Sequence, residues 1–191
     1  MLGFRNPKPD AMTQSITSVR PQPDESGEYF KRYIDLVPKG DVIETLSAQA
    51  DELSKLIRAL PERAQGYAYA EGKWSVNQLL GHVLDSEWIF ASRCLWFARG
   101  NAGPLPGMDQ DEFVAGADFD SRSLTSLITE FEHVRQASLV LFRSFDQTIL
   151  DRSGVASDCK LSVRALMFLT AGHVGHHIDV FRERYLPGLS G

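Results

Sequence analysis

The sequence predicts an all-α protein that folds as a four-helix bundle. Apolar residues recur at spacings of three and four over four long segments, and capping residues mark where several of these segments begin. Residues 100–122, between the second and third segments, are too many for a tight antiparallel turn. We therefore expect the chain to cross the bundle there, so that helices two and three run parallel in an up-down-down-up arrangement.

The predicted helices follow in order along the chain. Residues 28–38 are rich in aromatics and predict a short docked helix, and the first long helix covers residues 41–60 before Pro61 stops the pattern. The second begins after Ser75, which forms a capping box with Gln78. The third runs from about residue 123 to residue 145, and the fourth opens with Ser162 as its cap.

Length and composition predict one domain. The 191 residues, 43% of them hydrophobic, can bury one core. Residues 1–27 contain four prolines among polar residues and show no packing period, so we expect a flexible N-terminal tail followed by a bundle over residues 28–191.

Charge and hydropathy limit the partners. The formal net charge is −5 at pH 7 and there is no run of lysines or arginines, so we expect neither nucleic acid nor a membrane surface as a partner. No apolar run reaches the roughly 18 residues that span a bilayer, and prolines and charges stand where a signal peptide would need an apolar segment. Two separated cysteines fit a reducing compartment, so a cytoplasmic location is predicted.

The histidines predict a metal site. His173, His176 and His177 lie within five residues of the last helix. His173 and His177 are about 40° apart on one helix face, close enough to share a metal ion, whereas His176 lies about 60° off that face and is expected beside the site. His82, early in the second helix, is the predicted third ligand. Three nitrogen ligands leave a coordination position open, as in a catalytic site; a buried polar network without metal is the alternative.

Other polar residues accompany these histidines. Ser86 and Arg93 share the helix side of His82 and are predicted, with His176, to contact a bound cofactor or cosubstrate. Glu87 falls within the apolar stripe, where a carboxylate is costly to bury unless it is paired. It is either a catalytic group or a salt-bridge partner. A zincin protease is excluded, because Val174 stands where His-Glu-x-x-His requires glutamate.

Four motifs resemble the DinB-like family of bacterial proteins. They are residues 71–76 (Glu-Gly-Lys-Trp-Ser-Val), 81–87 (Gly-His-Val-Leu-Asp-Ser-Glu), 104–111 (Pro-Leu-Pro-Gly-Met-Asp-Gln-Asp) and 161–177. The resemblance covers about residues 28–187 and implies a four-helix bundle that binds a divalent metal, nickel or zinc, through His82, His173 and His177. Relatives often read Gly-His-Glu-Leu-His-His in the last motif, so Val174 and Gly175 depart from the pattern and no role of that glutamate carries over.

The resemblance also implies a function. We expect a metal-dependent transferase in which a small thiol such as bacillithiol, mycothiol or glutathione binds the metal as a thiolate and attacks an electrophilic substrate. A metal-dependent hydrolase is one alternative, with Glu87 or an acid of residues 109–112 moving the proton. A non-catalytic metal-binding or stress-response scaffold is another. The expected partners are a small-molecule substrate and a second copy of the chain, with Trp88 and Trp96 as candidate homodimer contacts.

Overall fold

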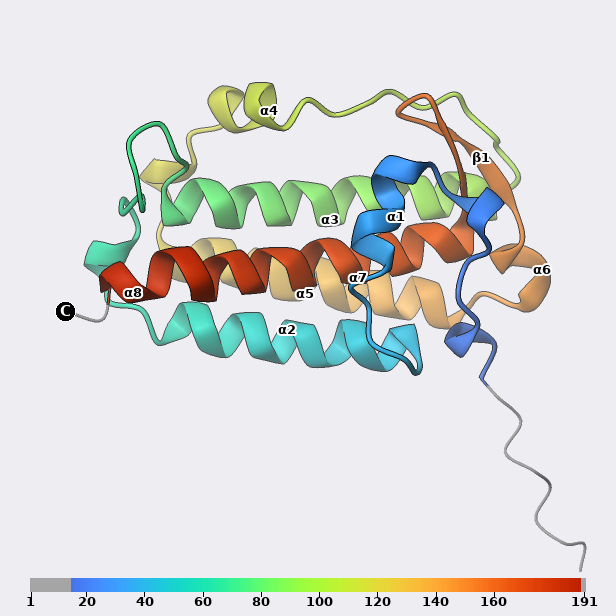
Figure 1. Ribbon diagram of the computed structural model, residues 1–191, viewed down its shortest axis with the longest axis horizontal. Coiled ribbons are helices and arrows are strands. Elements are labelled where there is room, and N and C mark those ends of the chain that lie inside the picture. The colour runs from blue at the N-terminus through green and yellow to red at the C-terminus, as the bar shows by residue number, and fades with distance from the viewer. Residues whose placement is uncertain (1–14, 190–191) are drawn as a thin grey trace, which may run out of the picture.

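The computed structural model describes residues 15–189 and shows a four-helix bundle (Figure 1). Within this range the long helices are α2 (Val42–Arg58), α3 (Val76–Ala98), α5 (Leu124–Arg143) and α7 (Val163–Val180). Figure 1 shows that α3 and α5 run in one direction and α2 and α7 in the other. The predicted all-α class and the up-down-down-up order are confirmed.

The crossover between α3 and α5 returns along the outside of α3 (Figure 1). It contains the short helix α4 (Gln110–Gly116) and a 3₁₀ turn at Phe119–Ser121. The side chain of Asp109 caps α4, since its Oδ1 accepts hydrogen bonds from the backbone N–H groups of Asp111 and Glu112. A helix of 23 residues is about 34 Å long, which is why the chain needs so many residues to return to its start.

Local capping fixes where the long helices begin. The hydroxyl of Ser75 accepts from Gln78 N, and Gln78 Oε1 accepts from Ser75 N, which completes the predicted capping box of α3. The hydroxyl of Ser162 accepts from Ala165 N at the start of α7. These caps place the first turns of the two helices that carry the histidines.

The segment between α5 and α7 contains three elements that were not predicted. Residues between α5 and α7 form a short helix, α6 (Gln147–Leu150), and an antiparallel hairpin of β1 (Ser153–Ala156) and β2 (Cys159–Ser162). Strand β1 also joins the crossover, because Leu105 N donates to Val155 O at 2.9 Å. The hairpin therefore holds the first part of the crossover beside the end of α3.

The N-terminal segment packs on the bundle. Helix α1 (Glu28–Ile34) lies against α7. Ahead of it, Arg20 donates to the carbonyls of Val37 and Ile34, and Glu25 pairs with Arg164 at 3.1 Å. Residues 15–27 of the predicted flexible tail are therefore held on the bundle by side-chain contacts, which leave no apolar period in the sequence. Residues 1–14 of that predicted tail lie outside the described residues.

A polar layer divides the core into two apolar clusters. On each long helix, residues of one cluster precede the layer and residues of the other follow it. Gln49 of α2, Glu87 of α3 and Arg135 of α5 form the layer and are buried. Gln49 Nε2 donates to Ala171 O at 2.9 Å, which extends the layer to α7. Among residues 15–189, none of the helices has the length and apolar character that a bilayer span requires.

Candidate metal centre

The three predicted ligands converge between α3 and α7. Nε2 of His82 lies 3.1 Å from Nε2 of His173, and Nε2 of His177 lies 3.2 Å from the same atom. All three ligand atoms lie within 4.8 Å of one another. Nitrogens bound to one tetrahedral ion at 2.0–2.1 Å are about 3.3 Å apart, so the observed spacing fits a shared divalent cation.

Hydrogen bonding alone does not account for this geometry. A ring nitrogen of histidine carries either one hydrogen or one in-plane lone pair, so Nε2 of His173 can take part in one good hydrogen bond. It has two neighbours at hydrogen-bond distance. The geometry therefore favours lone pairs directed at one cation over a buried polar network without metal.

Burial keeps the cluster neutral. Desolvation, helped by the charge of His176, lowers the pKa of His82 from 6.5 to about 4. Desolvation and the neighbouring histidines lower the pKa values of His173 and His177 well below the ordinary value. Neutral imidazole is the form that ligates a metal, so the three side chains hold the required state at neutral pH.

Packing orients the imidazole rings. Nδ1 of His173 and Nδ1 of His177 are buried without a hydrogen-bond partner in residues 15–189. Aromatic rings surround the cluster instead, with Trp74 at 5.0 Å from the His82 centroid and Phe90 at 5.5 Å from that of His173. The orientation of the Nε2 atoms is thus set by shape rather than by a bonded carboxylate or carbonyl, the partners that ligating histidines ordinarily have.

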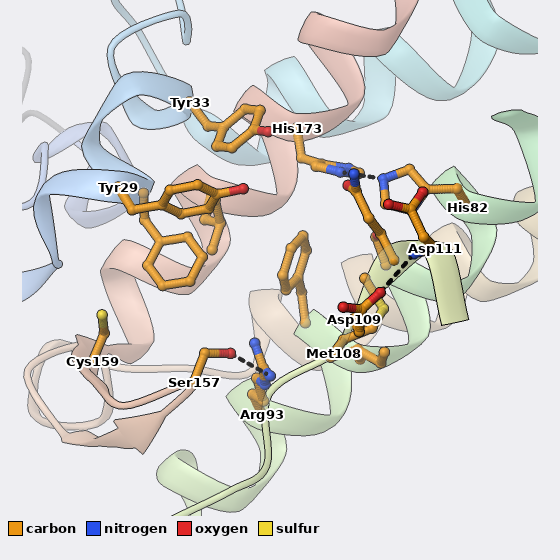
Figure 2. A pocket seen from close by; sticks show the side chains of 16 residues that line it. Tyr29, Tyr33, His82, Arg93, Met108, Asp109, Asp111, Ser157, Cys159 and His173 are labelled. Carbon is orange, nitrogen blue, oxygen red and sulfur yellow. Dashed lines mark hydrogen bonds between the residues drawn. The ribbon is translucent and has the colours of Figure 1, made fainter. Parts of the chain in front are cut away.

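A cavity of about 430 Å³ adjoins the cluster, and His82 and His173 form part of its wall (Figure 2). Its other walls come from five parts of the chain, namely α1, α3, the crossover, the hairpin and α7. They include Tyr29 and Tyr33 of α1, Ser86 and Arg93 of α3, Asp109 and Asp111 of the crossover, Ser157 and Cys159 of the hairpin, and Leu169 of α7. A ligand in this cavity would contact both the histidines and these polar groups.

The remaining predicted residues divide into two groups. Ser86 and Arg93 line the cavity, but His176 is not part of its wall and packs against Tyr33, with ring centroids 5.5 Å apart.

Glu87 is bound by Arg135, whose Nε and Nη2 donate to its two carboxylate oxygens at 2.8 and 2.7 Å. Both side chains are fully buried. The structure therefore places Glu87 as a salt-bridge partner, the other interpretation that the sequence left open, with both carboxylate oxygens engaged by Arg135 and outside the cavity wall.

Several cavity residues were missed in the sequence. Tyr29, Tyr33, Ser157 and Cys159 line the cavity although they belong to no long helix. The aromatic content of residues 28–38 was a sequence signal for the two tyrosines, whereas no pattern marked Ser157 or Cys159. Gly172 explains how α1 reaches the site, since a Cβ at this position would overlap the carbonyl group of Tyr33. Gly175 also allows a close approach, because the absence of a side chain there makes room for the amide of Gln49.

Comparison with known proteins identifies relatives. The family model for the DinB superfamily matches residues 45–180. OB0413 of Oceanobacillus iheyensis, a proposed metal-dependent hydrolase, is 23% identical over 137 residues, which cover 71% of this chain and 79% of that protein. YfiT from Bacillus subtilis, described as a probable metal-dependent hydrolase with an unusual four-helix bundle topology, has a TM-score of 0.63 and 16% identity over 91% of this chain and 92% of YfiT.

A further solved structure is the mycothiol-dependent maleylpyruvate isomerase. It has a TM-score of 0.63 and 14% identity over 76% of this chain. The match covers 61% of the isomerase, so this chain spans about three fifths of its length. At these identities the solved structures show a shared fold.

Proposed function

Because this chain belongs to the DinB superfamily, we propose that it binds one divalent metal ion through His82, His173 and His177 and transfers a small thiol to an electrophilic substrate. The observation that supports a metal ion is that two histidine nitrogens lie close to a single atom, Nε2 of His173. Nickel and zinc are the proposed metals, since both accept imidazole nitrogen.

The cavity chemistry favours a thiol as the nucleophile. A divalent ion lowers the pKa of a thiol bound beside it, so that thiolate is available near neutral pH. Activation of water instead calls for a general base close to the histidines. In the described part of the bundle interior, Glu87 is bound to Arg135 and Val174 is an apolar core residue, so neither supplies that base. The fold shared with a mycothiol-dependent isomerase also supports the thiol.

Hydrolysis is the second candidate. Two relatives are named as hydrolases, and two exposed carboxylates, Asp109 and Asp111, line the cavity. Asp109 is engaged in capping α4, which leaves Asp111 as the proposed base. The two reactions separate in one assay, because a hydrolase turns over esters or amides without any thiol, whereas a transferase requires one.

We further propose that the protein forms a homodimer in the cytoplasm and acts on a small molecule. The homodimer is supported by large apolar side chains at the surface of α3 and α4. Trp88 is 49% exposed, Trp96 48% and Phe113 45%. Exposed aromatics grouped on neighbouring elements are typical of a protein interface.

Elemental analysis of untagged protein tests the metal site. We expect about one nickel or zinc ion per chain in the wild type and none in the triple variant His82→Ala, His173→Ala, His177→Ala. His133→Ala, at an exposed position of α5, and His176→Ala are matched controls that should keep the ion. Wild-type protein that lacks metal, and fails to take up either ion on reconstitution, would contradict the proposal.

A further inference from the structure

Arg93 is a buried cation without a counter-ion. It is 5% exposed, and its Nη2 donates to the carbonyl of Pro106 at 2.7 Å and to the hydroxyl of Ser157 at 3.0 Å. Both partners are neutral, and no carboxylate of residues 15–189 forms an ion pair with it. Burial lowers the pKa of Arg93 and no neighbouring charge opposes this. Since burying an unpaired charge is unfavourable, its place in the cavity wall indicates an anion that comes from a ligand.

Ser86 provides a second, independent indication. Its side chain is fully buried, its Oγ has no hydrogen-bond partner in the described chain, and it lines the same cavity. Buried hydroxyl groups are almost always bonded, so the free Oγ marks a place for a polar atom of a ligand.

These groups form one polar track along α3. Taking His82 as 0°, Ser86 lies at about 40° and Arg93 at about 20° around the helix axis. The Cα atoms of His82 and Arg93 are about 16 Å apart along the helix, and a helical side chain points back toward the N-terminus, so Arg93 extends toward His82. In Figure 2, Arg93 lies across the cavity from His82 and His173.

We infer that the cavity binds a ligand with a single carboxylate, held by Arg93, at the end remote from the metal-binding atom. The planar guanidinium fork matches a carboxylate, and Ser86 bonds a polar group between the two ends. Asp109 and Asp111 line the same cavity and are exposed, so they disfavour a ligand with several negative charges. The inference that one end of this ligand binds the metal rests on the proposed function. The inference that the other end is a carboxylate rests on Arg93 alone.

The experiment compares matched thiols on the cobalt-loaded protein. The probes are 3-mercaptopropionate, 6-mercaptohexanoate and 8-mercaptooctanoate, each beside the mercaptoalcohol of the same length. Calorimetry measures affinity, and the cobalt absorption spectrum reports thiolate coordination. For at least one length we expect the acid to bind about tenfold or more tightly than its alcohol, the factor that a charge-assisted hydrogen bond contributes.

Variants assign the preference to Arg93. Arg93→Gln should bind acid and alcohol equally, and Arg93→Lys should restore part of the preference. Arg99→Gln removes an exposed arginine just beyond α3 and is the matched control that should behave as wild type. Equal affinity of acid and alcohol in the wild type at every length would overturn the inference. So would an acid preference that persists in Arg93→Gln.

The two readouts separate this inference from the proposed function. If the spectrum stays unchanged while calorimetry shows the acid preference and its loss in Arg93→Gln, thiol binding to the metal fails and the Arg93 site is supported. If the spectrum changes with acid and alcohol alike and their affinities are equal, metal-thiol chemistry is supported and the Arg93 site is refuted.

Discussion

Replacing Glu87 by glutamine would leave a fixed positive charge in the middle of the bundle. Arg135 and Glu87 are both fully buried, so the guanidinium of Arg135 would lose its counter-charge in a place that water does not reach. The variant weakens the two bonds of 2.8 and 2.7 Å and leaves the bond from Arg135 Nη1 to Leu46 O. Breaking one side of a buried pair typically costs about 3–5 kcal/mol, and we expect a loss of that size in the free energy of unfolding.

Two controls test this reasoning. The double variant Glu87→Met, Arg135→Met removes both charges, so its free energy of unfolding should lie within about 2 kcal/mol of wild type. Glu132→Gln breaks the partly exposed pair with Arg58, whose side chains are 31% and 43% exposed, and should cost less than about 1 kcal/mol. Urea unfolding of the metal-free protein, followed by circular dichroism and extrapolated linearly, measures all three.

A small effect would refute the reasoning. If Glu87→Gln costs less than 1 kcal/mol, or if the double variant is as unstable as the single one, Glu87 is not the counter-ion that keeps Arg135 buried. Metal content gives a separate reading, because folded Glu87→Gln should still hold its ion. A variant with normal stability and normal metal but no turnover would restore the catalytic interpretation.

Three further predictions follow from the structure. Because the pKa of His82 is about 4 when folded and 6.5 when unfolded, the unfolded state binds a proton that the native state does not, so His82 alone should cost the metal-free protein about 3 kcal/mol between pH 6.5 and 4. The lowered pKa values of His173 and His177 add to this loss, so the pH profile of urea unfolding should be steep in the wild type and shallower in His82→Gln, and a flat wild-type profile would contradict the prediction. Gly172→Ala should destabilise by about 1–3 kcal/mol because its Cβ meets the Tyr33 carbonyl, whereas Gly66→Ala, with nothing within 4 Å, should change stability by less than about 1 kcal/mol in the same assay. Trp96→Ser should shift the protein from dimer to monomer in sedimentation velocity, and a wild type that sediments as a monomer would refute the homodimer.

The fold was predictable where its determinants are local. The capping box of Ser75 and Gln78 involves residues three apart, so the sequence alone indicates where α3 begins. The parallel direction of α3 and α5 follows from the number of residues between them, because a chain that must return along a helix needs a long connection. The convergence of His82 with His173 and His177 combines helix periodicity with that topology.

Contacts between distant segments were not predictable. The partner of Glu87 is 48 residues away on α5, and the helical period of α3 alone does not specify it. The β1–β2 hairpin has strands of four residues, too short for an alternating pattern to be distinguished from a loop. Tyr33 reaches the cavity only because Gly172 admits the backbone of α1 against α7.

The polar side chains of α3 fall on two different sides of the helix. Ser86 and Arg93 fall within about 40° of His82, whereas Glu87 lies at about 140°. The first side borders the cavity and the second meets Arg135 in the core. A substitution at Glu87 should therefore change the free energy of unfolding while ligand selection is retained, and Arg93→Gln should do the reverse. Parallel losses in both variants would mean that the core pair and the cavity are coupled through α3.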